Sequence, residues 1–176
     1  MNLTEKQKSS KTIYDGKILK LLVDGVELPD GANAIREIVR HSGGAAVLFV
    51  KEGKVALVKQ YRYAYGKEMY EIPAGKMEKS EDARFSASRE LEEETGYRAK
   101  TISHLLDIYP SPGYTDEIIH IYFTDSADFV GQKPDGDEFL DCAFLPLNEV
   151  VKLIECGEIC DAKTVVAIYK YINGTK

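Results

Sequence analysis

The chain has 176 residues, of which 44% are hydrophobic and 30% are charged. This composition is typical of one globular domain and excludes a disordered, collagen-like or disulfide-scaffold protein. The net charge of −6 at pH 7 argues against nucleic acid as a partner, because an acidic surface repels the phosphate backbone.

The N-terminus and the cysteines indicate the compartment. The segment MNLTEKQKSS has no apolar stretch like that of a signal peptide, and the longest strongly apolar run, residues 45–50, is far shorter than the roughly 20 residues of a membrane helix. The spacing of Cys142, Cys156 and Cys160 is typical neither of a zinc site nor of a disulfide framework. We therefore expect a soluble cytoplasmic protein that does not contact a membrane.

The first part of the chain predicts a series of β-strands. Its apolar segments are rich in β-branched or aromatic residues and are broken by Asp24-Gly25, Asp30-Gly31 and Glu52-Gly53, which are typical of turns. The last of these pairs is expected to join a β-hairpin. The predicted strand segments are KILKLLVDGVEL, AIREIVRHS, AAVLFVKEGKVALVKQYRY and MYEIPAG.

A helix is predicted over residues 80–95, a stretch that contains no glycine or proline. Ser80 is the expected N-cap, and Gly96 follows the helix where a left-handed residue is favoured. Apolar residues recur every four positions and predict one buried stripe, made of Ala83, Ala87 and Leu91.

The rest of the chain predicts three more strands and two helices. The strand patterns are TISHLLDIY, IIHIYFTDS and FLDCAFLPL. The helical patterns cover residues 147–156 and 162–172, and the second has four candidate inward-facing residues, Val165, Val166, Ile168 and Ile172. Strands on either side of a central helix, followed by more helix, predict an α+β fold with a mixed sheet.

The central helix is expected to end in four carboxylates, Glu90 and Glu92 to Glu94. Carboxylates are unfavourable at the negative end of the helix dipole, and Glu90 and Glu94 lie one turn apart, where like charges repel. Such a run is either a solvated helix end or a site for a compensating cation. Carboxylates three and four residues apart can share a divalent ion, and Mg²⁺ is typically held by carboxylates, waters and substrate phosphates.

The spacing around this run resembles the Nudix box. Seven fixed identities match at fixed offsets, and Tyr97 stands where the pattern has an aliphatic residue. The order along the chain is Gly75, five residues, Glu81, seven residues, Arg89-Glu90-Leu91, one residue, Glu93-Glu94, one residue and Gly96. Nudix hydrolases cleave nucleoside diphosphates linked to another moiety, using Mg²⁺ or Mn²⁺. The resemblance therefore implies a metal-dependent pyrophosphohydrolase.

The same resemblance implies the architecture and the substrate. It predicts a Nudix-like mixed β-sheet sandwiched by helices over residues 41–176, after an N-terminal antiparallel strand region over residues 1–40 that is exchanged in a homodimer. Segments beyond the box resemble the subfamily that hydrolyses ADP-ribose to AMP and ribose 5-phosphate, including the proline of the loop after the box, here Pro112. These segments are VKQYRYAYGKEMYEIPAGKME, PSPGYTDE and KPDGDEFLDCAFLP.

The resemblance also assigns the metal ligands. It places them on Glu90, on Glu94 and on the backbone carbonyl of Ala74, with Glu93 as a further candidate. Gly75 would let the chain turn so that this carbonyl points at the helix, where a Cβ would often clash. Arg89 is implied to orient a ligand carboxylate, and the alternative for this residue is an ordinary surface ion pair.

The catalytic base and the substrate contacts lie outside the box. The base is implied to be a glutamate on a loop before a late strand, with Glu138 as the first choice and Asp137 as the second, unless these acids serve only solubility. Arg62 is the candidate phosphate contact, because a guanidinium matches phosphate geometry. An earlier strand carries Arg36, Glu37 and Arg40, which could meet the adenine and the phosphates. Ile18 could cover one face of the base.

Two other functions remain open at this stage. One is a pyrophosphatase for another nucleoside diphosphate sugar or for a dinucleotide such as NADH. The other is a sensor that binds ADP-ribose without cleaving it. The sensor predicts eroded box carboxylates, whereas the carboxylates of this box are intact.

Overall fold

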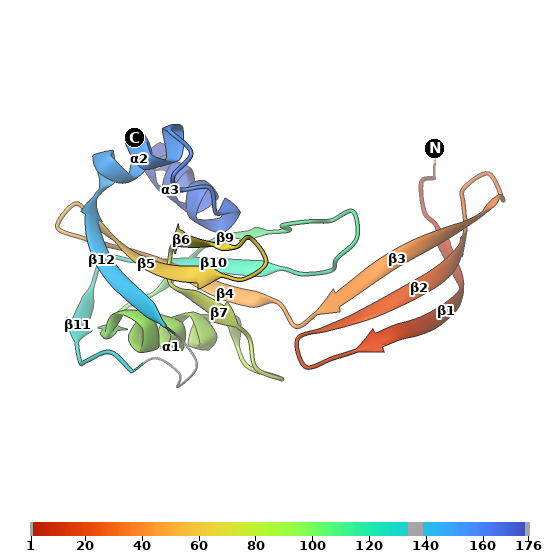
Figure 1. Cartoon of the computed structure of the whole chain (residues 1–176), viewed down its shortest axis with the longest axis horizontal. Helices are drawn as coiled ribbons and strands as arrows, with labels where there is room; N and C mark the ends of the chain where they lie inside the picture. Colours follow the sequence, from red (N-terminus) through yellow and green to blue (C-terminus); the bar gives the residue numbers. More distant parts are fainter. Residues whose placement is uncertain (1, 134–138, 175–176) are drawn as a thin grey trace. The chain divides into compact units, whose positions relative to one another are not determined.

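The computed structural model describes residues 2–133 and 139–174. The chain divides into two compact units (Figure 1). The first contains Met1–Gly43 and Tyr109–Ile118, and the second contains Gly44–Ile108 and Ile119–Lys176. In the described part of the chain, no helix is both long enough and apolar enough to cross a membrane.

The first unit is a three-stranded antiparallel sheet. Its strands are β1 (Lys6–Asp15), β2 (Leu19–Glu27) and β3 (Asn33–His41), in that spatial order. The segment 109–118 is attached to β3, because the N–H of Val39 donates to the carbonyl of Tyr114 over 2.7 Å and the Val39 carbonyl accepts from Asp116 over 3.2 Å. The predicted antiparallel strand region is thus present and also holds a loop from the middle of the chain.

Two features of this sheet differ from the sequence prediction. Strand β1 was not predicted, because its sequence KQKSSKTIYD is mostly polar and every residue in it is exposed. Asp24-Gly25 was predicted as a break but lies inside β2, where Gly25 pairs with Ser9 next to a register shift in β1. A Cβ on Gly25 would come within 2.6 Å of the Ser9 hydroxyl. Gly25 therefore allows β1 and β2 to approach closely and does not form a turn.

The second unit is built on a seven-stranded mixed sheet. The strand order is β12-β5-β4-β10-β9, with β6 paired to β5 and β7 paired to β4. Only the β4–β10 pair among these described strands is parallel. The bounds are β4 (Gly44–Lys51), β5 (Lys54–Arg62), β6 (Lys67–Glu71), β7 (Ala74–Lys76), β9 (Ser103–Ile108), β10 (Ile119–Thr124) and β12 (Leu140–Pro146).

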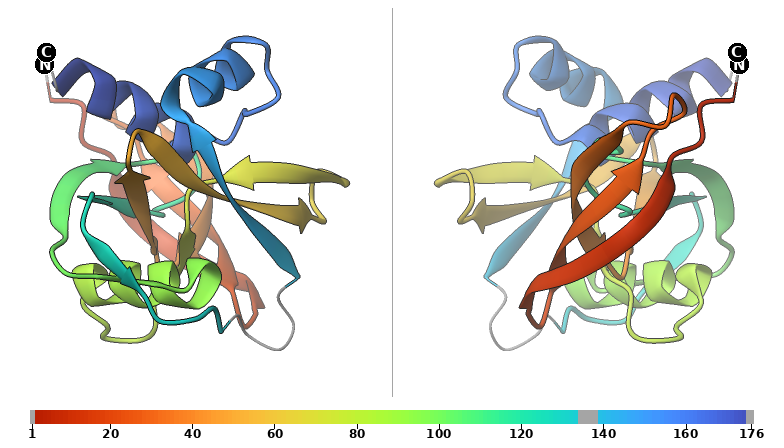
Figure 2. Two further views of the ribbon diagram at one scale, coloured as in Figure 1. Left: turned by 90° about the vertical axis from the view of Figure 1, so that its left-hand side faces the viewer. Right: turned by 90° about the vertical axis from the view of Figure 1, so that its right-hand side faces the viewer.

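Helices cover both faces of this sheet. Helix α1 (Ala83–Thr95) lies on one face, and α2 (Leu147–Glu155) and α3 (Ala162–Gly174) lie on the other (Figures 1 and 2). Strand β4 is buried from Gly44 to Val50 and supplies alternate side chains to two cores. Phe49 packs in the α1 core, and Leu48 packs in the α2 and α3 core. The predicted α+β sandwich is confirmed.

Most of the predicted elements are present, and the local turn chemistry explains their ends. Glu52 and Gly53 have φ angles of 53° and 74° and connect β4 to β5, which confirms the predicted hairpin. Gly96 ends α1 in the left-handed conformation, with φ of 76°. Two short strands, β8 (Tyr97–Ala99) and β11 (Ala127–Phe129), were not predicted.

The predicted start of α1 was wrong. Ser80 has a left-handed φ of 67° and lies before the helix. Asp82 is the N-cap instead, and its side chain accepts from the backbone N–H groups of Arg84 and Phe85 over 3.0 and 3.1 Å. In α3, Val166 was expected inside but is 38% exposed, whereas Lys163 and Thr164 are buried. Lys163 can be buried because its ammonium pairs with Glu71 and Asp161.

Candidate active site

The turn before α1 is held against the end of that helix. Ala74 begins β7, and its N–H donates to the Glu94 carboxylate over 2.9 Å. The preceding Pro73 carbonyl accepts from Val47 of β4 over 2.9 Å. Strand β7 continues this pairing, with Gly75 opposite Ala45. The segment that carries the proposed carbonyl ligand is therefore fixed by both the sheet and the helix.

Gly75 allows the Glu90 carboxylate to lie directly against the backbone of this turn. A Cβ built on Gly75 would overlap with the Glu90 carboxylate. The backbone of Gly75 does not need a positive φ, so the requirement is for space. Glu90 and Glu94 are only 6% and 2% exposed, which excludes a helix end whose acids simply point into solvent.

Arg89 binds three carboxylates at once. Its guanidinium contacts Glu81 over 3.0 and 3.2 Å, and its NH1 group lies 2.8 Å from oxygens of both Glu90 and Glu93. The Glu81 hydrogen bond raises the pKa of Arg89 despite the opposing effect of burial. Glu81 also accepts the N–H of Glu78 over 2.9 Å, which braces the loop before α1. Arg89 thus organises the box and is not an isolated surface ion pair.

The C-terminal carbonyls of α1 have donors from outside the helix. The N–H of Lys133 donates to the carbonyl of Glu93 over 3.1 Å, and the side-chain amide of Gln132 donates to the carbonyl of Glu94 over 2.6 Å. These donors satisfy carbonyls that would otherwise add to the negative potential beside the acids. The role of Gln132 was not predicted, because its partner lies far away in the sequence.

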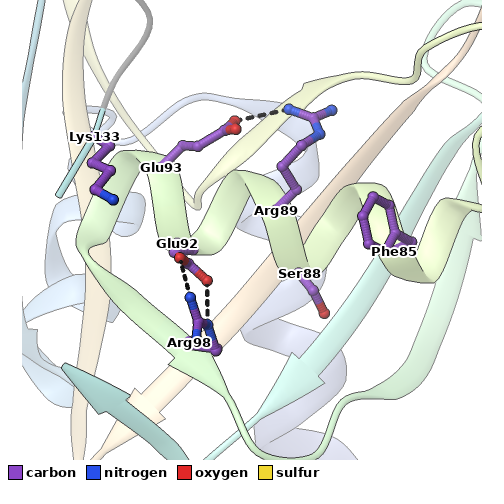
Figure 3. Close-up of a pocket in the computed structure, with 7 residues that line it drawn as sticks. All are labelled: Phe85, Ser88, Arg89, Glu92, Glu93, Arg98 and Lys133. Carbon is purple, nitrogen blue, oxygen red and sulfur yellow. Dashed lines mark hydrogen bonds and ion pairs between the residues drawn. The ribbon is translucent and has the colours of Figure 1, made fainter. Parts of the chain in front are cut away.

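A pocket of about 400 Å³ opens on the outer side of α1 (Figure 3). Arg89 and Glu93 border it and form an ion pair with each other, while Glu92 binds Arg98 through two contacts of 2.7 and 2.8 Å. The full lining is Phe85, Ser88, Arg89, Glu92, Glu93, Arg98 and Lys133. Two residues of the box are therefore accessible from an open cavity.

The donor set fits a hard divalent cation. Carboxylate and carbonyl oxygens are the ligands that such ions prefer, and the absence of a Cβ at Gly75 lets the buried Glu90 carboxylate lie directly against the turn that also binds Glu94. In the described residues, no group of three or more His, Cys, Asp or Glu side chains is already arranged around one metal position. The contacts explain this, since Glu90 and Glu93 both point an oxygen at Arg89.

Comparison with known proteins decides the family. Residues 39–166 match the NUDIX domain, and residues 5–39 match the nucleoside diphosphate sugar hydrolase N-terminal domain. The chain belongs to the Nudix hydrolase family. Enzymes of this family generally use divalent metal ions, in agreement with the oxygen donors of the box.

Several relatives of this Nudix chain are similar over nearly its full length. An ADP-ribose pyrophosphatase of Bacillus subtilis is 44% identical over 95% of this chain and 92% of the relative. A methanol dehydrogenase activator of Bacillus methanolicus is 45% identical over 93% of this chain and 90% of the relative. The crystal structure of an ADP compounds hydrolase has the same fold, with a TM-score of 0.86 at 20% identity over 98% and 95% of the two chains.

The predicted substrate contacts of the Nudix chain fall into two groups. Arg62 lies in the same unit as the box, and its guanidinium is paired with Glu71. The others lie in the first unit, where Arg36 pairs with Glu5 and Arg40 pairs with Asp116. Glu37 is exposed, and Ile18 is 62% exposed. The candidate bases Glu138 and Asp137 lie outside the described residues.

Proposed function

We propose that this Nudix enzyme hydrolyses ADP-ribose to AMP and ribose 5-phosphate with Mg²⁺ as its metal. The observation that carries the proposal is the burial of Glu90 and Glu94 against the Ala74-Gly75 turn, with Arg89 shared among the surrounding carboxylates. The name of the Bacillus subtilis relative supports the substrate.

The box residues would share the work of holding the ion and the substrate phosphates. Glu90, Glu94 and the Ala74 carbonyl would hold the metal, with Glu93 as a further ligand. When bound, a divalent ion lowers the pKa of water and offsets charge on the phosphates. Arg89 keeps the carboxylates of Glu90 and Glu93 in place through its NH1 group. Mn²⁺ fits the same oxygen donors.

The base in this proposal is Glu138, with Asp137 as the alternative. Its carboxylate would take a proton from the attacking water. Glu138→Gln removes that capacity and keeps the size of the side chain, so turnover should fall while the affinity for Mg²⁺, measured by calorimetry, stays near wild type. An unchanged rate would move the base to Asp137 or elsewhere.

The proposed substrate contacts complete the site. Arg62 would bind a phosphate, while Arg36, Glu37 and Arg40 would meet the adenine and the phosphates and Ile18 would cover one face of the base. The exposure of Ile18 and Glu37 supports this role, because both side chains are accessible. We also propose a cytoplasmic homodimer in which the strand region of residues 1–40 is exchanged. Its oligomeric state can be measured by light scattering.

A product assay tests the substrate. Purified protein is incubated with ADP-ribose and Mg²⁺, and AMP and ribose 5-phosphate are identified by chromatography and mass spectrometry. We expect stoichiometric formation of both products and no reaction in EDTA. Absence of AMP, with cleavage of another nucleotide sugar under the same conditions, would refute ADP-ribose as the substrate.

A second candidate is hydrolysis of a different nucleoside diphosphate sugar or of a dinucleotide. It is favoured by the match of residues 5–39 to the nucleoside diphosphate sugar hydrolase N-terminal domain, whose description names the broader substrate class. A panel containing GDP-mannose, ADP-glucose and NADH, compared by kcat/KM, separates the two candidates. Binding of ADP-ribose without any turnover in Mg²⁺ or Mn²⁺ would instead support a sensor.

A further inference from the structure

A second cluster of charges, centred on a buried carboxylate, lies beside the box and was not predicted from the sequence. Its centre is Glu71, the last residue of β6, which is 2% exposed. Arg62, at the end of β5, reaches it from the neighbouring strand, and Lys163 reaches it from the first turn of α3. Residues far apart in the chain thus converge on one carboxylate.

The contacts within this charge cluster fix the plane of the Arg62 guanidinium. Its Nε and NH2 groups donate to the two Glu71 oxygens, each over 2.6 Å. Lys163 donates to one of the same oxygens and also contacts Asp161 over 3.1 Å. Because the Arg62 pair is bidentate and Lys163 also binds the Glu71 carboxylate, the guanidinium has one defined orientation.

The electrostatics agree with this arrangement. Burial opposes ionisation of Glu71, but the hydrogen bond from Arg62 and the charge of Lys163 outweigh it and hold the pKa of Glu71 below its ordinary value. The Glu71 hydrogen bond raises the pKa of Arg62, and the charge of Glu94 adds to that rise. Arg62 therefore lies close enough to the acidic end of α1 to interact with it.

The same helix terminus also restrains the turn of the box. The Thr164 hydroxyl accepts the N–H of Ile72 over 2.8 Å and donates to Asp161 over 2.6 Å. Ile72 is followed by Pro73, bonded to β4, and by Ala74, bonded to Glu94. The start of α3 thus holds both Glu71 and the residue after it, immediately before the proposed metal-binding turn.

We propose that Lys163 is a positioning residue for hydrolysis. It holds the Glu71 carboxylate, which in turn orients Arg62 so that the remaining NH1 group is available to a substrate phosphate. This inference rests on the proposed function, because it assigns Arg62 to the substrate. It makes efficient hydrolysis depend on a residue outside the Nudix box, namely the buried Lys163 of α3.

The first test is the Lys163→Met variant, which removes the ammonium and keeps a similar stem. We expect kcat/KM for ADP-ribose to fall about tenfold, mainly through a higher KM, as is typical when the support of a binding group is removed. Calorimetry in EDTA should show weaker ADP-ribose binding as well. Lys170→Met is the matched control, since Lys170 lies on the same helix, is exposed and has no ion pair among the described residues. It should match wild type.

A double-mutant cycle separates positioning from general stability. In an Arg62→Ala background, Lys163→Met should cause no further loss of kcat/KM, because the group that it orients is gone. A purely structural role would lower kcat/KM by the same factor in both backgrounds and would overturn the proposal. Thermal melts confirm that each variant is folded at the assay temperature. If Lys163→Met does not fold, Lys163→Gln is used, which keeps a donor and should show a smaller loss of the same kind.

Measuring turnover of ADP-ribose by the wild type separates a failure of the positioning role of Lys163 from a failure of the proposed substrate. Wild-type turnover of ADP-ribose together with an unchanged Lys163→Met variant would contradict the positioning role alone. Absence of wild-type turnover would contradict the proposed substrate, and the same cycle is then run on the nucleoside diphosphate sugar that the product panel identifies. Equal effects of Lys163→Met and Lys170→Met on that substrate would also overturn the positioning role.

Discussion

Glu71 and Glu94 are equally buried, each being 2% exposed, but their surroundings differ. Glu71 is bound by two cations, Arg62 and Lys163. Glu94 accepts the N–H of Ala74 and lies in a box where one arginine serves three other carboxylates. Burial of a carboxylate is costly, and the chain holds Glu71 with two cations of its own, whereas in the box a single arginine is shared among Glu81, Glu90 and Glu93.

This difference separates a carboxylate that the chain's own cations hold in place from carboxylates that are proposed to hold a metal ion. A carboxylate with two cationic partners supports folding and has little to gain from an external ion. Acids gathered at the C-terminal end of a helix oppose its stability, and a bound metal ion would relieve this effect.

Glu94→Gln should abolish most activity and leave the fold intact. The change removes one negative charge from the proposed metal site at constant size, so we expect kcat to fall more than about 100-fold, beyond the usual effect of losing a supporting group. Stability should be unchanged or higher, because the repulsion from Glu90 is reduced. Steady-state kinetics and thermal melts with and without Mg²⁺ measure both quantities. Near-normal turnover would rule out the metal assignment.

Gly75→Ala tests the space beside Glu90. The new Cβ would overlap with the Glu90 carboxylate and displace it, so we expect activity to fall by about 10- to 100-fold with a small change in melting temperature. Gly174→Ala is the control, because a Cβ at that position meets no atom within 4 Å. Equal activities of the two variants would show that Glu90 does not need its observed position.

Glu71→Gln should lower stability and, because Glu71 orients Arg62 in the proposed site, should also raise the KM for ADP-ribose. Removing the charge leaves Lys163 buried with a weaker set of partners, and breaking such a pair costs about 3 kcal/mol of unfolding free energy. Because the folded-state pKa of Glu71 is lowered, its contribution is present above the ordinary value of 4.5 and is lost as the pH falls through the folded-state pKa. Urea unfolding from neutral pH down to about pH 3 should therefore show a shallower acid loss in the variant than in wild type. Parallel pH profiles would contradict this assignment.

Cys142 offers the mildest test, because its thiol reports the charge of Glu94. Burial raises the pKa of Cys142 to about 11, and the charge of Glu94 adds to the rise. We expect slow alkylation of Cys142 at neutral pH in the wild type and a modestly lower thiol pKa in the Glu94→Gln variant. The pH dependence of iodoacetamide labelling, read at Cys142 by mass spectrometry, measures the difference. An identical thiol pKa in both proteins would show that the two side chains do not interact.

Local features of this fold were predictable because their physics lies within a few residues. The turn at Glu52-Gly53, the left-handed Gly96 and the buried face of α1 follow from neighbouring residue types. The choice of Asp82 over Ser80 as the N-cap was not predictable, because both are good capping residues and the left-handed backbone at Ser80 decides between them. Strand β1 was missed because its polar sequence has no buried face to reveal it.

The family and the acidic helix of the box could be predicted from local spacing, because most residues of the Nudix pattern lie on one short segment that follows the helical repeat. The partners that surround this helix could not be predicted in that way. Lys163 meets Glu71 across 92 positions, and Gln132 reaches Glu94 across 38. Such partners carry no local spacing signal, since they are brought together by the packing of helices and strands that are remote in the chain.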